Sequence, residues 1–176
     1  MSVINIQYYS SPVGEIMLGA FEGQLCLADW RFRKMRSFID NRLQNAFKAV
    51  FTEETTDVIE ETKRQLDEYF DGERKEFDLP LLIVGSHFQE QVWRELLKIP
   101  YGETKTYLKL SRDLGNEKAI RAVASANGAN AVSIIVPCHR IIGSDGRLVG
   151  YAGGLPAKKK LLKLEGAAVM NQGTLF

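Results

Sequence analysis

Residues 133–140 of the chain read SIIVPCHR, and this stretch carries the candidate chemistry of the second half of the sequence. The apolar run Ser133–Val136 predicts a short buried strand that ends just before Cys138. A nearby cation lowers the pKa of a thiol, so Arg140 favours a reactive cysteine that titrates below the ~8.5 of a free thiol. His139 can take the thiol proton, directly or through one water, if a third group orients its ring.

Glu165 is the candidate for that third group, because it ends a helix that we expect over residues 157–165. The Cys–His–Glu set fits a cysteine hydrolase and a group-transfer protein equally well, and the residues alone leave both open. Between these residues, Gly150–Gly154 predicts a flexible loop whose backbone donors face a small ligand. A plain surface turn is the alternative for this loop.

Upstream of the cysteine, two short helices are expected over residues 106–114 and 117–127, separated by Gly115 and Asn116. This pattern is the outline of a helix-turn-helix. The second helix is rich in alanine, and after Lys118 its only long polar side chain is Arg121. Such a helix cannot read bases in the major groove, but it can approach a backbone or a narrow groove closely. An ordinary buried alanine helix is the alternative.

The first half of the chain predicts a different unit. Alternating apolar residues over the first 30 positions, with turns at Ser11–Gly14 and Glu22-Gly23, predict a three-stranded antiparallel sheet. Helices are expected over residues 37–49 and 56–70, followed by an extended linker that ends near Gly85. We therefore expect a domain over residues 1–85, a second over 86–170, and a tail over 171–176.

The fold class that follows is a two-domain α/β protein. Its N-terminal domain holds the three-stranded antiparallel sheet with helices. Its C-terminal domain is mostly helical and holds the helix-turn-helix and the short active-site strand.

Charge separates the two halves as well. Residues 1–85 hold 10 Lys and Arg against 15 Asp and Glu, a net charge of −5, whereas residues 86–176 hold 13 against 7, a net charge of +6. A basic half favours nucleic-acid binding by the C-terminal domain. The apolar stretches are far shorter than the ~20 residues of a membrane helix, and no leader is recognisable, so we expect a cytoplasmic protein without a membrane partner.

Cysteine and histidine are scarce. The chain has two of each, namely Cys26, His87, Cys138 and His139, and a closed zinc site needs four such ligands. Because Cys138 and His139 are adjacent, they are poorly spaced to share one tetrahedral ion. We expect no metal site, and we expect Cys26 to be a small core residue within a strand.

The motif Pro137–Arg140 after an Ile/Val run resembles the active-site signature of the O6-alkylguanine-DNA alkyltransferases. Further residues occur in the order and spacing of that family, and the resemblance covers residues 86–166. They are Phe88-Gln89, Val92-Trp93, Ile99–Glu103, Tyr107, Arg121–Val123, Asn130, the loop Tyr151–Leu155, Lys158 and Leu164–Gly166. Residues 1–85 are similar to the variable, ribonuclease-H-like N-terminal domain of the same family.

The resemblance implies a DNA-repair protein that moves an alkyl group from the O6 atom of guanine to its own Cys138, with O4-alkylthymine as a second expected substrate. His139, Glu165 and Asn130 would activate the thiol, and Tyr107 would rotate the target phosphate and offer its hydroxyl to the guanine ring. No cofactor is implied, and each molecule would act once.

The resemblance also implies a DNA-binding surface and a substrate pocket. Arg121 would fill the gap left when the damaged base flips out, with the small residues of its helix in the minor groove. The implied groove residues are Ala119, Ala122 and Ala126, together with Tyr107. The implied substrate-binding residues are Ile141, Tyr151, Ala152, Gly153 and Lys158.

Two alternatives of other classes remain. A non-catalytic sensor of alkylated DNA would bind the lesion without transfer, and it would not need Cys138. A cysteine hydrolase would use the Cys–His–Glu set but would need neither Arg121 nor the alanine helix.

The tail carries a separate pattern, Gln172-Gly173-Thr174-Leu175-Phe176. It resembles the short peptides by which bacterial repair and replication proteins dock on the sliding clamp, with Leu175 and Phe176 filling an apolar cleft. The alternative is that these two side chains pack on the surface of the protein itself.

Overall fold

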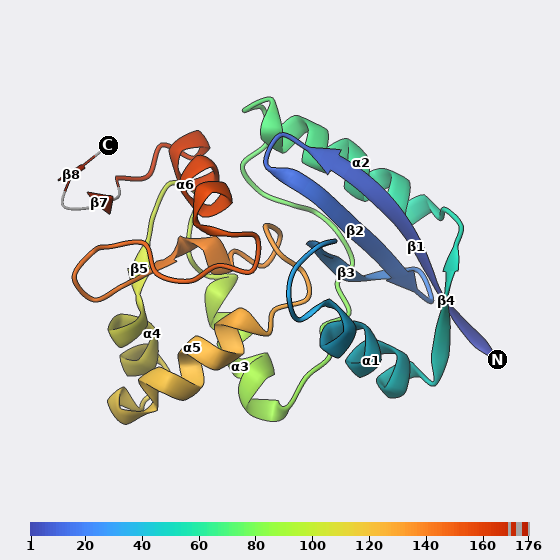
Figure 1. Cartoon of the computed structure of the whole chain (residues 1–176), viewed down its shortest axis with the longest axis horizontal. Helices are drawn as coiled ribbons and strands as arrows, with labels where there is room; N and C mark the ends of the chain where they lie inside the picture. Colours follow the sequence, from blue (N-terminus) through green and yellow to red (C-terminus); the bar gives the residue numbers. More distant parts are fainter. Residues whose placement is uncertain (169, 172–173, 176) are drawn as a thin grey trace. The chain divides into compact units, whose positions relative to one another are not determined.

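The computed structural model describes residues 1–168, 170–171 and 174–175, and for the last four of these it describes the backbone alone (Figure 1). The chain divides into two compact units, Met1–Gly85 and Ser86–Phe176. Among the helices of the described residues, none has the length and apolar character needed to span a membrane.

The first unit is built on a four-stranded sheet in the order β3-β2-β1-β4. The strands β1 (Ser2–Ser11), β2 (Gly14–Phe21) and β3 (Gln24–Trp30) form the antiparallel meander expected from their alternation. The turn between β2 and β3 has positive φ at both central residues, 49° at Glu22 and 80° at Gly23. This geometry suits the twist of a tight hairpin.

A fourth strand completes this sheet. The helix expected to reach residue 49 ends earlier, as α1 (Arg36–Phe47), and Lys48 has the left-handed φ of 50°. The chain then enters β4 (Ala49–Glu53), which pairs in parallel with β1 from Ser2↔Ala49 to Ile6↔Glu53. Val50, Phe51 and Thr52 favour a strand, and pairing with β1 satisfies backbone groups that a longer helix would leave at an open sheet edge.

One face of this sheet is covered by α2 (Asp57–Phe70), which contacts β1, β2 and β3 (Figure 1). The side chain of Thr56 caps the helix by accepting from the backbone N–H of Ile59. Ile59, Leu66 and Tyr69 on its apolar face are almost fully buried. They join strand residues such as Ile16 and Leu18 in the core of this unit.

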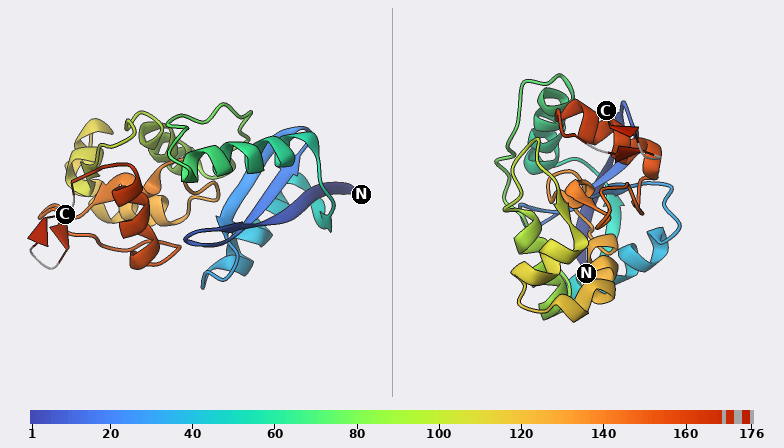
Figure 2. Two further views of the ribbon diagram at one scale, coloured as in Figure 1. Left: turned by 90° about the horizontal axis from the view of Figure 1, so that it is seen from above. Right: turned by 90° about the vertical axis from the view of Figure 1, so that its left-hand side faces the viewer.

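The second unit is mostly helical. Its helices α3 (His87–Leu96), α4 (Tyr107–Asp113), α5 (Ile120–Gly128) and α6 (Leu155–Leu164) lie around the segment that follows α5 (Figures 1 and 2). The indole Nε1 of Trp93 donates to the backbone oxygen of Ala126 at 2.8 Å, which ties α3 to α5. Gly115, Asn116 and a single 3₁₀ turn, η1 (Glu117–Ala119), separate α4 from α5 and produce the expected helix-turn-helix.

The segment before the cysteine differs from the expected strand. Ser133–Val136 forms a tight turn in which the backbone N–H of Ile135 donates to Ser133 and Ile134 has a φ of 71°. Asn130 takes the place of a neighbouring strand, because its side chain accepts from the N–H of Val132 and donates to the oxygen of Val136, both at 2.9 Å. The apolar composition of Ser133–Val136 therefore reflects the burial of this segment and not its pairing in a sheet.

The strand of the active-site region lies after the cysteine. Cys138 opens a 3₁₀ turn, η2 (Cys138–Arg140), and β6 (Ile141–Ile142) follows and pairs in parallel with β5 (Lys105–Thr106). After α6, β7 (Met170–Asn171) pairs with β8 (Thr174–Leu175). Of the proposed clamp motif, Gln172, Gly173 and Phe176 lie outside the described residues.

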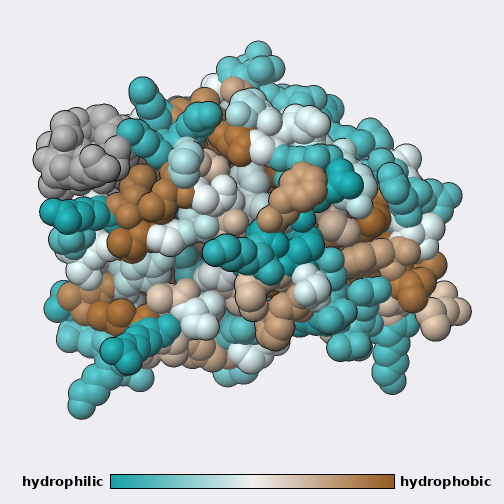
Figure 3. Space-filling model, viewed as in Figure 1, coloured by the Kyte–Doolittle hydropathy of each residue, from teal (hydrophilic) through white to brown (hydrophobic). Residues whose placement is uncertain are grey.

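The face seen in Figure 3 is mixed, with hydrophilic side chains between small separate groups of apolar ones. Isolated exposed apolar side chains are normal on a soluble domain. The α/β two-domain fold class predicted from the sequence is confirmed, with the fourth strand as an addition.

Candidate active site around Cys138

Cys138 occupies a fixed and buried position in the second unit. It is the first residue of η2, and Pro137 alone separates it from the turn that the Asn130 side chain holds together. Its thiol is not part of a disulfide. The side chain of Asn130 bonds to backbone groups of Val132 and Val136, and these contacts position the segment that carries the thiol.

A buried hydrogen-bonded cluster surrounds the next two residues. His139 Nε2 lies 2.7 Å from Glu165 Oε1, and both side chains are fully buried. Arg140 donates to both oxygens of the same carboxylate, from Nε and from Nη2, at 2.9 Å each. Its Nη1 donates to the backbone oxygen of Ile99 at 2.6 Å, so the guanidinium is anchored at both ends.

The protonation states of this cluster follow from its contacts. Burial alone raises the pKa of Glu165, but the hydrogen bonds and charges of His139 and Arg140 outweigh it and hold the pKa at about 2. Burial lowers the pKa of His139, although Glu165 opposes this shift. Around neutral pH we therefore assign an ionised Glu165 beside a neutral imidazole.

This assignment selects the free nitrogen of the imidazole. A neutral His139 that donates from Nε2 to the carboxylate carries its lone pair on Nδ1. Nδ1 is buried and has no hydrogen-bond partner among the described residues. The cluster thus presents a proton acceptor on the residue that follows the thiol.

Tyr107 opens α4, and its hydroxyl faces the amide of Asn127 at 3.5 Å. The same amide nitrogen lies 3.4 Å from the backbone oxygen of Cys138. Burial raises the pKa of the Tyr107 hydroxyl, so it is protonated at neutral pH. Asn127 was not predicted from the sequence, although its spacing of four residues after Val123 places it on the buried face of α5.

Lys158 holds the glycine-rich loop in place. Its side chain is buried in α6, and Nζ donates to the backbone oxygens of Val149 and Gly150 at 3.2 Å each. Burial lowers the pKa of Lys158 to about 8. Tyr151 in this loop lies edge-on to the imidazole of His139, with ring centroids 6.5 Å apart.

The remaining predicted substrate residues occupy this same region. Ala152 and Gly153 are half-buried in the loop, and Ile141 is fully buried in β6, three residues after the cysteine. The structure therefore brings the Cys138 segment, the loop and the buried end of α6 into one unit of the chain.

On α5 the structure separates the predicted DNA-contacting residues into two groups. Arg121 and Ala122 are exposed on one face of the helix, and Ala119 in η1 is half-exposed. Ala126 is buried against α3, where its backbone oxygen accepts from Trp93. Its prediction as a groove contact is thus wrong, because alanine spacing alone does not tell the core face from the open face.

Arg140 is the second residue whose role the sequence analysis did not assign. The sequence marked it only as a positive charge beside the thiol, whereas its guanidinium is held by Glu165, 25 residues later in the chain. Such a pairing depends on tertiary structure. The one sequence-based indication of this pairing was the general rule that a buried carboxylate such as Glu165 needs a cationic partner.

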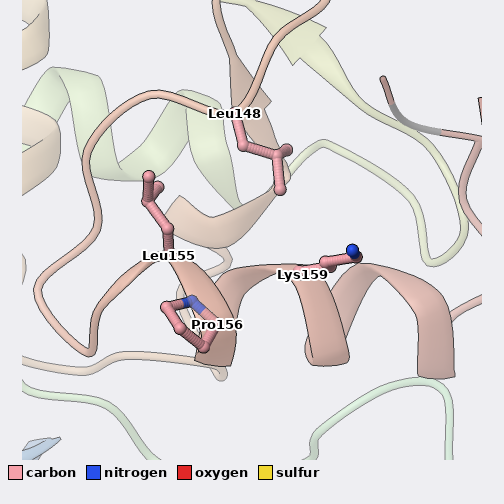
Figure 4. A pocket seen from close by; sticks show the side chains of 4 residues that line it. All are labelled: Leu148, Leu155, Pro156 and Lys159. Atoms are coloured by element: carbon pink, nitrogen blue, oxygen red, sulfur yellow. The ribbon is translucent and has the colours of Figure 1, made fainter. Parts of the chain in front are cut away.

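An apolar cavity of about 340 Å³ lies beside the loop (Figure 4). Leu148, Leu155, Pro156 and Lys159 line it, from the chain before the loop and from the first turns of α6. Cys138, His139 and Glu165 are not among these lining residues, so the cavity is separate from the cluster described above.

Comparison with known proteins relates both halves of the chain to one family. A family model described as the DNA binding domain of 6-O-methylguanine DNA methyltransferase matches residues 87–167. The model of the ribonuclease-like domain of the same methyltransferase matches residues 4–83. The chain is 44% identical over 160 residues to the methylated-DNA–protein-cysteine methyltransferase of Methanosarcina acetivorans, covering 90% of this chain and 96% of that protein.

Solved structures agree with this relationship. The O6-methylguanine methyltransferase of Mycobacterium tuberculosis superposes with a TM-score of 0.77 at 36% identity, covering 94% of this chain and 93% of that one. A structure of the M. tuberculosis protein in complex with DNA superposes with a TM-score of 0.79 at 36% identity, covering 92% of each chain.

Proposed function

The chain belongs to the 6-O-methylguanine DNA methyltransferase family, and on that premise we propose that Cys138 is the residue that accepts the alkyl group. The function is direct repair of alkylated DNA by transfer to a protein cysteine. The observation that carries the assignment is the buried His139–Glu165–Arg140 cluster next to Cys138.

The proposed step is a single displacement at the alkyl carbon. The thiol proton passes to His139 Nδ1, directly or through one water, while ionised Glu165 stabilises the imidazolium that forms. The sulfur–carbon bond forms as the bond between that carbon and guanine O6 breaks, and the electron pair leaves with the base. The Tyr107 hydroxyl donates a proton to the leaving guanine ring, and the proton held by His139 returns through solvent to Tyr107, so that both residues end neutral.

This step balances without a cofactor, and its product is a thioether. A thioether does not hydrolyse under mild conditions, so each molecule acts once. Transfer from O4-alkylthymine and the expected cytoplasmic location stay predictions.

The exposed face of α5 is proposed to bind the DNA and to give the protein access to the damaged base. A base in a duplex must leave the stack before its O6 atom can reach a buried thiol. Arg121 is exposed on that face beside Ala122, which lets the helix approach a groove closely. We assign Arg121 to the gap in the stack and the loop Gly150–Gly154, held by Lys158, to the flipped base.

The experiment that tests the acceptor compares Cys138→Ser with Cys26→Ser on an excess of oligonucleotide containing O6-methylguanine. Cys26 is the matched control, because it is buried in β3 and burial raises the pKa of its thiol to about 12. Loss of transfer in Cys138→Ser with retained transfer in Cys26→Ser supports the assignment. Binding without transfer by the parent protein would indicate a sensor, and repeated turnover would indicate a hydrolase.

We also propose that the tail docks on the replication sliding clamp, on the basis of its sequence pattern alone. Burial of Leu175 and Phe176 in a cleft of the clamp would give ~3–6 kcal/mol before ordering costs, which suits transient recruitment. The test titrates a fluorescent peptide of residues 167–176 with the clamp of the source organism. Binding that is lost in the Leu175→Ala/Phe176→Ala peptide supports docking, and no binding by peptide or whole protein refutes it.

A further inference from the structure

Asn127 places one amide group between two parts of the active site. It lies on the buried face of α5, and only 5% of its surface is exposed. Its Nδ2 is 3.5 Å from the hydroxyl oxygen of Tyr107 and 3.4 Å from the backbone oxygen of Cys138. An amide nitrogen carries two hydrogens, so it can serve both acceptors at once.

These contacts also determine which way the amide points. The backbone oxygen of Cys138 is an acceptor only, so the amide must present its nitrogen to it, because its own oxygen would be repelled. The Tyr107 oxygen then accepts from Asn127, and the hydroxyl hydrogen of Tyr107 is directed away from Asn127. A phenol held in this way keeps its hydrogen for another acceptor.

We propose that Asn127 is a positioning residue for the transfer reaction, which aims the Tyr107 hydroxyl hydrogen at the leaving guanine. The inference rests on the proposed function, in which Tyr107 donates a proton to the guanine ring. Asn127 acts through Tyr107 and has no contact of its own with the reacting carbon.

A purely structural role explains Asn127 poorly. Its Oδ1 is buried and has no hydrogen-bond partner among the described residues. An apolar side chain of similar size would fill the same space without an unsatisfied buried acceptor. The advantage of asparagine at this position therefore lies in its two donor hydrogens.

Electrostatics acts in the same direction. Burial raises the pKa of Tyr107, which weakens it as a proton donor, and the hydrogen bond from Asn127 opposes this rise. Asn127 thus supports both the direction and the ease of proton donation by Tyr107.

The test is a double-mutant cycle with Asn127→Leu and Tyr107→Phe, measured as the maximal single-turnover rate of transfer from O6-methylguanine in duplex DNA. Leucine keeps the number and branching of the side-chain heavy atoms and removes both donors. We expect Asn127→Leu to slow transfer about 10-fold in the parent protein but less than about 3-fold when Tyr107 is already phenylalanine. Val123→Ala is the matched control, because it removes a fully buried side chain one turn earlier on α5 and no hydrogen bond.

Each outcome is informative. Equal slowing by Asn127→Leu in both backgrounds, or no slowing in the parent, overturns the inference, as does the same non-additivity in Val123→Ala. If Tyr107→Phe transfers at the parent rate, the proposed role of Tyr107 itself fails. Thermal melts and DNA affinities, measured for the parent and every variant, check that the rates compare folded, DNA-bound proteins.

Discussion

Acid should weaken the C-terminal unit, because Glu165 must then take up a proton against the hydrogen bonds of His139 and Arg140. These contacts hold the pKa of Glu165 at about 2, compared with its ordinary value of 4.5. A difference of this size corresponds to about 3 kcal/mol in the free energy of unfolding. This is a large part of the stability of an ordinary domain.

The sign of the effect follows from the direction of the shift. The folded pKa lies below the unfolded one, so the unfolded chain binds the proton first as the pH falls. The full contribution is present above about pH 5 and is lost as the pH approaches 2. At pH 3 about 2 kcal/mol of it should be gone.

The assay is urea denaturation followed by the fluorescence of Trp93, in a Trp30→Phe background so that only the C-terminal unit is observed. The comparison variant is Arg140→Met/Glu165→Gln, which removes the ion pair without leaving one buried charge alone. Other carboxylates titrate in both proteins. The difference in stability between them should therefore shrink by about 2 kcal/mol from pH 7 to pH 3. An unchanged difference would refute the lowered pKa of Glu165 and the stabilising contacts that are held to cause it.

Three further predictions address the thiol base, the flipped base and the loop. His139→Phe should slow transfer strongly at neutral pH and less at high pH, where the thiol ionises unaided; an unchanged pH profile in single-turnover assays would exclude His139 as the base. Arg121→Ala should reduce repair of duplex DNA ~10- to 100-fold more than it reduces reaction with free O6-benzylguanine. The control Arg94→Ala on α3 should leave the ratio of the two rates unchanged. Equal losses on both substrates would make Arg121 a structural residue. The pKa of Lys158 in the folded protein is about 8, below its ordinary value of 10.5. The free energy of unfolding of the parent should therefore rise by about 2 kcal/mol between pH 7 and pH 10, and that of Lys158→Met, measured by denaturation, should not show this rise.

Local patterns predicted most of the fold. The alternation in residues 1–30 specifies the meander, since each strand has one buried face and short turns connect neighbours. β4 was not predictable in the same way, because it pairs with β1 across more than forty residues of sequence. Ser133–Val136 was misread as a strand because its backbone partner is the side chain of Asn130, and an apolar run alone does not reveal that.

In the candidate site, too, only the local features could be predicted. Cys138 and His139 are neighbours in the sequence, so their chemistry could be inferred from the sequence alone. The pairing of Arg140 with Glu165 and the place of Asn127 between Tyr107 and Cys138 depend on how helices pack. The side of α5 on which Ala126 lies is likewise decided by its contact with Trp93.

The most direct test of the central claim is a measurement of where the alkyl group goes and how many are taken. The protein is incubated with a large excess of duplex containing O6-methylguanine, its intact mass is recorded over time, and its peptides are mapped. Transfer to Cys138 predicts a mass increase of one methylene per molecule and a plateau at that value. Only the peptide that contains Cys138 should be modified. Release of more than one methyl group per molecule, or modification of the Cys26 peptide, would contradict the account.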